Sequence, residues 1–571
     1  MSTFRKLQLP KTIGEVLLCI FNCIFFVIFL YFFLHSLINN GAPYLSFSAG
    51  KVLLTTGIIL FLLLFIYFVA DLITRIVKRK HNTSEQIEYN ATNKKTPSKR
   101  IAQAAIKKQQ LQKRRNVIYW IVGFIILFIA QIMYTRMFYT SIGWDCGTIV
   151  SMAIGMLQGN TDSLGYLAQF PNNSALFLLL YHYFKICLGL GITDLVFASV
   201  VLNIVFLDIA VVFMICVAHK VWNKISEIAV TLVLSILALA FTPWLIVPYT
   251  DTITILFPIA FLFLFQCISD QNNNISKKKQ TVLLLVLGFL IFMGFKLKPS
   301  SIILIIAIGI VVLCIKKDTK QQFATYGKNM IIMLCGVLVA LTLFTVDSNA
   351  VLGEYLSKDV YDTYEMPASY FTMVGLQKQP VSENKALWGA FNSEDYFAVS
   401  NITGKSAKKD YISSVIKNRI EAFGFTGSIE FLMAKANFCF EDGTFFWGSE
   451  GNFITGAAPA TSSSLGKWIQ SFIYFSSPNY ASGYSYLLQG IWMTILLLIL
   501  MGIVLAPNSY KNLPFMIMRI TIFGLLLYLL FFEARSRYLI NYLPIFILLA
   551  VNGLLSIINS FHSLKIKTEA E

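Results

Sequence analysis

Hydrophobic residues recur along the chain in long unbroken stretches that are separated by polar connections. A stretch of about 20 apolar residues is enough for a helix to cross the hydrocarbon core of a bilayer. Thirteen such stretches predict helices, at residues 14–38, 51–76, 117–139, 174–190, 195–218, 225–242, 253–268, 281–295, 300–315, 330–344, 487–505, 515–531 and 539–558. The pattern therefore predicts an all-α polytopic membrane protein with a bundle of about 12–13 transmembrane helices.

The polar connections divide the predicted bundle into regions. Five regions are expected: residues 1–76 with two N-terminal transmembrane helices, 77–116 as a basic cytoplasmic loop, 117–345 as the core helices with a first outer loop at 140–173, 346–486 as an extracytoplasmic region, and 487–571 with the C-terminal transmembrane helices. The region 346–486 is too long to be a simple linker, so it is expected to form a large loop domain.

Composition agrees with the membrane class and argues against a metal site built from cysteine. Hydrophobic residues make up 56% of the chain and charged residues 13%, which exceeds the apolar content of a soluble domain. The nine cysteines lie mostly inside apolar stretches, without CxxC spacing or histidine pairs. We interpret them as small packing residues.

The net charge of +17 is concentrated in one connection. Residues 77–116 hold twelve Lys or Arg against two acidic residues. Basic connections stay in the cytoplasm and face anionic lipid, so the charge indicates topology. We expect a surface helix at 101–115. Nucleic acid is not an expected partner, because no aromatic residues are interleaved with the basic run.

Charge also exposes a conflict in the number of crossings. The linkers 276–280 and 316–328 are basic, whereas the region 346–486 holds fourteen acidic residues against ten basic ones and is expected outside. Thirteen crossings would place that region inside, so one stretch must fail to cross, or two must act as one. The candidates are 174–190, which contains His182 and Lys185, and the pair split at 296–299. A broken helix at membrane depth is tolerated where it lines a polar cavity.

The candidate chemistry lies in polar residues at the ends of the predicted helices. No nucleotide-binding or soluble-hydrolase signature is present. The candidate residues are Asp145, Asp162, Tyr166, Gln169, Asn172, Asn173, Tyr249, Asp251, Lys296, Lys298, Glu533, Arg535, Arg537 and Tyr538. A carboxylate at the lip of a membrane helix is costly unless it is solvated or used, so Asp145 is the expected chemical centre.

Arg535 and Arg537 stand two residues apart between two apolar stretches. Guanidinium groups bind phosphate through planar pairs of donors, so the pair suits a lipid phosphate at the membrane surface. The alternative is a topological or snorkelling pair. Arginine is disfavoured on outer connections, which favours the functional interpretation.

The order of these features resembles the GT-C superfamily of membrane glycosyltransferases, which includes the protein O-mannosyltransferases and the aminoarabinose lipid A transferases. The resemblance rests on WDCG at 144–147, YLAQFPNN at 166–173, GFKLKPS at 294–300, a large outer loop, and EARSRY at 533–538. The FPNN motif together with DGTFFWGSEG at 442–451 is similar to a group of such proteins in Gram-positive bacteria of the lactic-acid type. The resemblance covers about 117–559, so the first two helices look like an addition.

The resemblance implies an inverting transfer of a sugar from a polyprenyl-phosphate donor to a cell-envelope polymer or glycolipid, at the outer face of a bacterial plasma membrane. Asp145 would be the general base. Many members carry a second acidic residue beside the first, where this chain has Cys146, which leaves Asp162 as the substitute. Lys296, Lys298, Arg535 or Arg537 would hold the leaving phosphate. The other candidate residues would bind substrate. Some members use a divalent metal, although the sequence shows no ligand cluster.

Two other functions remain open at this point. A flippase or transporter of lipid-linked sugar would also need polar residues at helix ends, but transporters usually show internal repeats, and none is visible by eye. A scaffold for envelope assembly would use Asp145 only as a solvated helix cap. One large outer region between helices favours the transferase.

Overall fold

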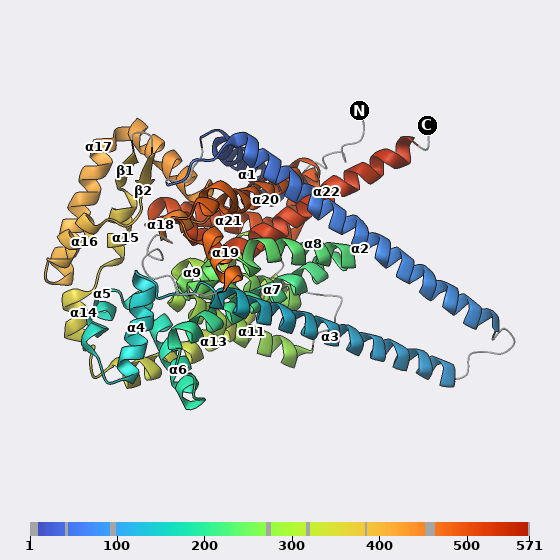
Figure 1. Cartoon of the computed structure of the whole chain (residues 1–571), viewed down its shortest axis with the longest axis horizontal. Helices are drawn as coiled ribbons and strands as arrows, with labels where there is room; N and C mark the ends of the chain where they lie inside the picture. Colours follow the sequence, from blue (N-terminus) through green and yellow to red (C-terminus); the bar gives the residue numbers. More distant parts are fainter. Residues whose placement is uncertain are drawn as a thin grey trace.

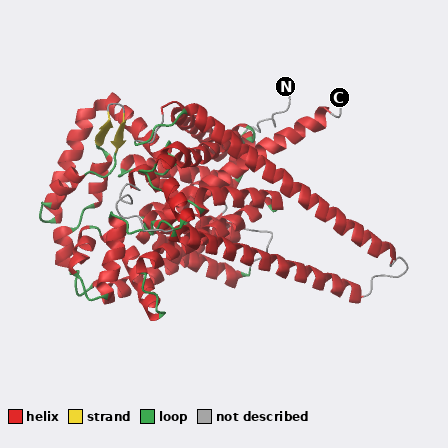
Figure 2. Cartoon of the chain, in the orientation of Figure 1, coloured by secondary structure: helices red, strands yellow, loops and turns green. Residues whose placement is uncertain are grey.

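The computed structural model describes residues 10–39, 44–91, 99–269, 276–315, 320–382, 385–450 and 463–568. Nearly all of this part is helical (Figure 2). Its one sheet is an antiparallel pair of strands, β1 (Lys378–Ser382) and β2 (Lys385–Trp388), with Gln379 opposite Leu387. The predicted all-α membrane class is confirmed.

Ten segments of the described chain are long and apolar enough to cross a membrane. They lie in α1 (Ile13–Asn39), α2 (Ala49–Ala91), α3 (Lys99–Arg136), α7 (Leu195–Trp222), α9 with α10 (Thr250–Ile253 and Leu256–Ser269), α11 (Lys277–Leu297), α13 (Lys320–Leu352), η7 with α20 (Tyr480–Tyr484 and Ser485–Val504), α21 (Leu513–Phe531), and η9 with α22 (Ser536–Tyr542 and Leu543–Thr568). The other three predicted stretches form shorter helices: α6 (Ser174–Gly189), α8 (Ile225–Ser235), which continues as the π-helical turn η3 (Ile236–Ala240), and α12 (Ile303–Ile315).

Mostly short elements, together with the long helix α17 (Lys405–Phe440), gather at one end of the bundle (Figure 1). The short elements are α4 (Asp145–Leu157), η1 (Asp162–Leu164), α5 (Gly165–Gln169), η2 (Pro171–Asn173), η4 (Pro243–Ile246), η5 (Pro299–Ile302), α14 (Lys358–Tyr364), α15 (Ala368–Gly375), α16 (Ser393–Ser400), α18 (Trp447–Glu450) and α19 (Ser464–Ile473). We call this end the site end. The opposite end, from which α2 and α3 project, is called the basic end, and η8 (Pro507–Lys511) lies there beside the start of α1.

Helix α6 explains the conflict in the number of crossings. Asp194, which caps the start of α7, pairs with Arg136 at the end of α3 at 2.8 Å. His182 within α6 lies 2.8 Å from Asp347, near the end of α13. The ends of α3 and α13 both lie at the site end, so α6 starts and finishes there. The stretch 174–190 therefore does not cross, and the other twelve predicted stretches comprise the ten long segments together with α8 and α12.

The region expected as a basic loop is mostly helical. Helix α2 continues to Ala91 and α3 begins at Lys99, so the helix expected at 101–115 is the first part of α3 and not a separate surface helix. Residues 92–98 lie outside the described residues. The Ala, Lys, Gln and Arg residues of this stretch all favour helix, and α2 and α3 therefore extend well beyond the bundle (Figure 1).

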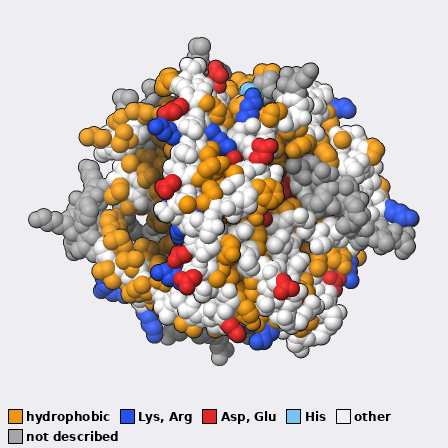
Figure 3. Space-filling model, turned by 90° about the vertical axis from the view of Figure 1, so that its left-hand side faces the viewer, with side chains coloured by type: hydrophobic (Ala, Val, Ile, Leu, Met, Phe, Trp, Pro, Cys, Tyr) orange, Lys and Arg blue, Asp and Glu red, His pale blue; other side chains and the backbone are white. Residues whose placement is uncertain are grey.

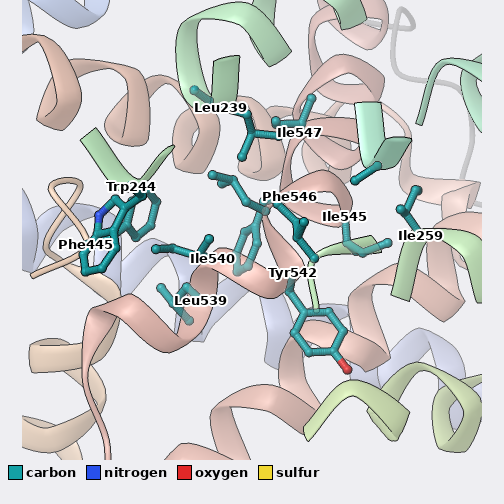
Figure 4. Close-up of a cluster of buried hydrophobic side chains, with 14 of the residues drawn as sticks. Leu239, Trp244, Ile259, Phe445, Leu539, Ile540, Tyr542, Ile545, Phe546 and Ile547 are labelled. Carbon is teal, nitrogen blue, oxygen red and sulfur yellow. The ribbon is translucent and has the colours of Figure 1, made fainter. Parts of the chain in front are cut away.

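The core is packed tightly between helix backbones. A Cβ atom on Gly553 of α22 would lie 1.7 Å from the Leu498 carbonyl oxygen of α20, so only glycine allows this approach. Near the site end, buried side chains including Trp244, Phe445 and Phe546 surround η9 (Figure 4). The hydroxyl of Tyr542 donates to the Ser300 carbonyl at 2.6 Å and ties η9 to η5.

Helix α17 organises the outer layer of the site end. It bends at Gly424, whose φ of 61° breaks the helical conformation. Lys408 donates to carbonyls at the end of α14 and Arg419 to the Met373 carbonyl of α15. Lys435 donates to three carbonyls, those of Gly375, Leu530 and Phe532. Cations at helix C-termini satisfy otherwise unpaired carbonyls.

Helix α1 is joined to the rest of the bundle by buried polar contacts. Arg519 of α21 is 1% exposed, and its Nη1 donates to Asn22 Oδ1 at 2.5 Å. Asn437 at the end of α17 donates to the Tyr31 hydroxyl at 2.8 Å. The first helix therefore packs against the bundle through one face and is not a separate anchor.

Candidate functional site

Ion pairs between four distant segments close the site end. Asp251 of α9 is 1% exposed and forms an ion pair with Lys298, which lies between α11 and η5. Its second carboxylate oxygen lies 2.9 Å from Arg537 Nε in η9. The sequence pattern predicted only that Asp251, Lys298 and Arg537 lie at the same side of the bundle. These contacts show that the three side chains meet.

The fourth segment contributes Glu450 at the end of α18. Its carboxylate forms an ion pair with Arg535 and lies 3.1 Å from Nη1 of Arg537. Arg535 Nε also lies 3.7 Å from Glu533, which accepts a hydrogen bond from the Tyr538 hydroxyl at 2.9 Å. We call Asp251, Lys298, Glu450, Glu533, Arg535 and Arg537 the ion cluster.

Asp145 lies beside the ion cluster as the first residue of α4, and it is exposed. Its Oδ2 accepts a hydrogen bond from the Tyr249 hydroxyl at 3.3 Å. Burial, followed by the charge of Asp145, raises the pKa of Tyr249 and of Tyr166 above the usual value for a phenol. Both phenols therefore keep their protons, and the carboxylate is held by neutral donors while it stays open to solvent.

Trp144 connects Asp145 to the arginines. The guanidinium of Arg537 lies over the Trp144 ring, 4.3 Å from its centroid, and the Trp144 and Tyr249 rings meet edge to face at 5.0 Å. A guanidinium over an aromatic face is attracted by the ring quadrupole. The carboxylate of Asp145 and the charge of Arg537 are therefore held in one compact unit.

A strained turn places Glu450. Phe445 and Phe446 both have positive φ, 52° and 69°, which is unfavourable for aromatic residues. The buried Asp442 carboxylate stabilises this turn, because it accepts hydrogen bonds from the backbone and hydroxyl of Thr444, from the Phe446 backbone at 2.7 Å and from the Ser536 hydroxyl at 3.0 Å. The turn leads directly into α18, and it also joins α18 to η9. Backbone strain of this kind occurs at functional sites.

Several polar atoms in the ion cluster lack a hydrogen-bond partner among the described residues. They are Nε of Arg535, Nε and Nη1 of Arg537, and Oδ2 of Asp251, all buried. Each lies within ion-pair range of an opposite charge but outside hydrogen-bond geometry. A ligand with negatively charged oxygens would satisfy the arginine donors.

A family model described as "conserved hypothetical integral membrane protein" matches residues 98–556. The chain belongs to this family. The matched range includes Asp145 and all of the ion cluster, and it begins after α2. No curated protein and no solved structure matches the chain. Within this integral membrane family, function must therefore be inferred from the geometry of the site.

Two of the candidate residues, Asn173 and Gln169, lie at the periphery of the site. Asn173 donates to the Tyr166 hydroxyl at 2.8 Å and thereby orients the phenol that faces Asp145. Gln169 accepts a hydrogen bond from Tyr396 of α16 at 2.9 Å and joins α5 to the outer layer. Neither contacts the ion cluster directly in the described contacts.

Three predicted site residues lie away from the ion cluster. Asp162 is exposed at the start of η1, where its backbone N–H donates to Asn160, and no described contact joins it to Asp145. Asn172 is exposed on η2. Lys296 lies over the Phe344 ring of α13 at 4.9 Å. The prediction that these residues share the site is therefore not supported by their contacts.

The described residues contain no group of three or more His, Cys, Asp or Glu that could hold a metal ion. The carboxylates nearest Asp145 are instead paired with lysine and arginine. A divalent metal thus remains an expectation from the resemblance alone.

Glu450 and Trp144 belong to the site, although the sequence analysis did not select them. A signal for Glu450 was available, since two buried arginines require carboxylate partners. Glu450 follows an aromatic turn with no membrane helix beside it, so its sequence position alone did not distinguish it from a surface residue.

Proposed function

We propose that the chain is a membrane glycosyltransferase that moves a sugar from a polyprenyl-phosphate donor to a cell-envelope polymer or glycolipid. One observation carries the proposal: the exposed Asp145 carboxylate directly follows Trp144, and the buried guanidinium of Arg537 lies over the Trp144 ring. A base next to an anion-binding group is the arrangement that sugar transfer from a phosphate needs.

In the proposed reaction, Asp145 accepts the proton of the acceptor hydroxyl. The hydroxyl oxygen forms a bond to the anomeric carbon of the donor sugar while the bond from that carbon to the phosphate oxygen breaks, through an oxocarbenium-like state. The polyprenyl phosphate leaves with the bonding electron pair. Direct attack from the opposite face inverts the configuration of the sugar. The phenols of Tyr249 and Tyr166 orient the carboxylate.

The arginines would stabilise the leaving phosphate. Arg537 is held in place by Asp251, Glu450 and the Trp144 ring. Donors fixed before the reaction stabilise developing charge without reorganisation. The carboxylates of the ion cluster would therefore set the direction of the two guanidinium groups, and the phosphate oxygens would accept from N–H groups of Arg535 and Arg537.

We infer that the site end faces away from the cytoplasm. The basic linker before α11 and the basic C-terminal segment belong to helix ends opposite the site, and basic connections remain in the cytoplasm. In a bacterial plasma membrane this orientation would give the site access to donor lipid in the outer leaflet.

Reconstitution of the purified full chain in liposomes tests the proposal. Radiolabelled polyprenyl-phosphate hexose is supplied with an extract of envelope glycopolymer or glycolipid, and wild type is compared with Asp145→Asn. We expect label on the acceptor with wild type and its loss in the variant. Movement of labelled lipid between leaflets without transfer would support the alternative, a flippase. Binding of the labelled lipid without transfer and without movement between leaflets would support a scaffold function.

A further inference from the structure

Helix α19 (Ser464–Ile473) has one strongly apolar and exposed face. Leu465 is 54% exposed and Trp468 is 60% exposed, and Phe472 follows on the same face at helical spacing. The rings of Trp468 and Phe472 lie 5.0 Å apart. The neighbouring side of the helix is buried at Gly466 and Ile473. A solvated surface helix would present polar side chains in place of this exposed face.

The contacts of α19 fix its level along the bundle. Gln470 Nε2 donates to the Met137 carbonyl at 2.7 Å, and Met137 directly follows the end of α3. Met133, one turn earlier in α3, is 59% exposed, and only 6% of the most apolar part of α3 is buried. The α3 surface is therefore lipid-facing, and α19 lies where that surface ends at the site end.

We propose that α19 lies in the membrane interface at the site end, with Leu465 and Trp468 inserted among the lipid headgroups and upper acyl carbons. The occupant of the apolar face is lipid, because that face continues the lipid-facing surface of α3. Tryptophan favours this depth, where its ring is apolar and its N–H remains hydrated. An amphipathic helix of this kind lies in the plane of the interface. Lys467, also exposed, can extend toward lipid phosphate.

One hydrogen bond joins α19 to α18, the helix that carries Glu450 of the ion cluster, so docking of α19 on the membrane would also stabilise the position of Glu450. The Trp447 indole N–H donates to the Ile473 carbonyl at the end of α19 at 2.9 Å. Trp447 is fully buried and begins α18, which ends at Glu450. The lipid surface thus supports the helix that supplies the carboxylate shared by Arg535 and Arg537. The docking itself does not depend on the proposed reaction.

Depth-resolved fluorescence of the full chain in phosphatidylcholine vesicles tests the proposal. The emission of Trp468 is obtained as wild type minus Trp468→Phe. We expect this difference signal to be lost when lipids are brominated near the headgroup, to be lost less with bromine near the chain end, and to resist aqueous iodide. Trp388→Phe is the matched control, because Trp388 lies in β2 within the outer layer; its difference signal should not respond to brominated lipid.

A second variant checks that the result does not arise from a local change in structure caused by Trp468→Phe. Leu465→Trp in the Trp468→Phe chain should restore quenching by the shallow brominated lipid. Quenching of Trp468 by iodide and not by brominated lipid would place α19 in water and overturn the proposal. Resistance to both quenchers would mean that a second copy of the chain covers this face, which also overturns it.

Discussion

The guanidinium of Arg537 lies 4.3 Å from the centroid of the Trp144 ring, although the two residues come from opposite halves of the chain. Trp144 directly precedes Asp145, and Arg537 is held by Glu450 and Asp251. A movement of η9, which contains Arg537, would therefore also move the start of α4. The proposed base and the proposed phosphate donors form one mechanical unit, and the following predictions test its parts.

Asp145→Asn should abolish most sugar transfer while the chain keeps its stability. Loss of a general base typically lowers the rate roughly 10²–10⁴-fold, and the exposed position of Asp145 makes a folding defect unexpected. Label transfer in liposomes measures the effect. Asp162→Asn is the control, because this carboxylate is exposed away from the ion cluster. Equal losses in the two variants would contradict the assignment of Asp145.

Arg537→Met should destabilise the chain strongly. The substitution leaves the buried carboxylates of Asp251 and Glu450 without one of their cations, and breaking a buried ion pair costs about 3–5 kcal/mol. The midpoint of thermal unfolding in detergent measures the loss. The double variant Arg537→Met with Glu450→Gln should recover part of it. Additive losses would show that the two side chains do not interact.

The stability of the chain should depend on pH through Lys435. Burial lowers the pKa of Lys435 to about 8, below the value of about 10.4 in an unfolded chain. Between these two values the unfolded state binds more protons, so the free energy of unfolding should rise with pH, by at most about 3 kcal/mol. Below pH 8 this contribution should be constant.

Unfolding midpoints of wild type and Lys435→Met, measured from neutral to alkaline pH, check the Lys435 prediction. The variant leaves the carbonyls of Gly375, Leu530 and Phe532 without their donor, so it should be less stable at every pH. Above pH 8, deprotonation of Lys435 should raise the free energy of unfolding of wild type, whereas the variant has no such group. Parallel curves over the whole range would show that Lys435 does not change its protonation there.

Asp442→Ala should weaken both stability and transfer. The carboxylate supports two residues with positive φ and also the Ser536 hydroxyl of η9. Hydrogen bonds to a charged group contribute about 1.5–3 kcal/mol each, so we expect a clear fall in the unfolding midpoint. Transfer should fall further than stability, since Glu450 follows this turn. Asp442→Asn, which keeps some acceptors, should lie between wild type and Asp442→Ala.

The non-crossing path of α6 can be tested by thiol labelling of vesicles. Leu190→Cys, at a position 73% exposed after α6, should react with an impermeant maleimide from the same side as Asp162→Cys. Lys278→Cys at the start of α11 should react only from the other side. Labelling above that of the unsubstituted chain is the measure. Leu190→Cys reacting together with Lys278→Cys would mean that α6 crosses.

The apolar stretches were sufficient to predict the long helices of the bundle, but not which of them crosses. The stretch 174–190 is apolar enough for a helix, and its failure to cross follows from pairing of His182 with Asp347 and of Asp194 with Arg136. These contacts join residues far apart in the sequence. The charge pattern indicated the conflict, and only tertiary contacts resolved it.

The contacts bring some of the candidate residues together and separate others that are neighbours in the sequence. Lys296 lies in the last turn of α11, whereas Lys298 follows the end of the helix in extended conformation, so the two side chains point in different directions. Lys298 reaches Asp251, and Lys296 lies over Phe344. A pattern of residue types cannot distinguish such neighbours. Glu450 was missed for a related reason, because the strained turn before it has no sequence period.

The contact between Arg519 and Asn22 gives the first helix a role that sequence comparison does not suggest. The family range begins after α2, yet an arginine inside that range has its amide acceptor in α1. A chain truncated to the family range would leave this guanidinium facing hydrocarbon with one acceptor fewer. A buried arginine of the family range thus makes one of its hydrogen bonds to a helix that lies outside that range.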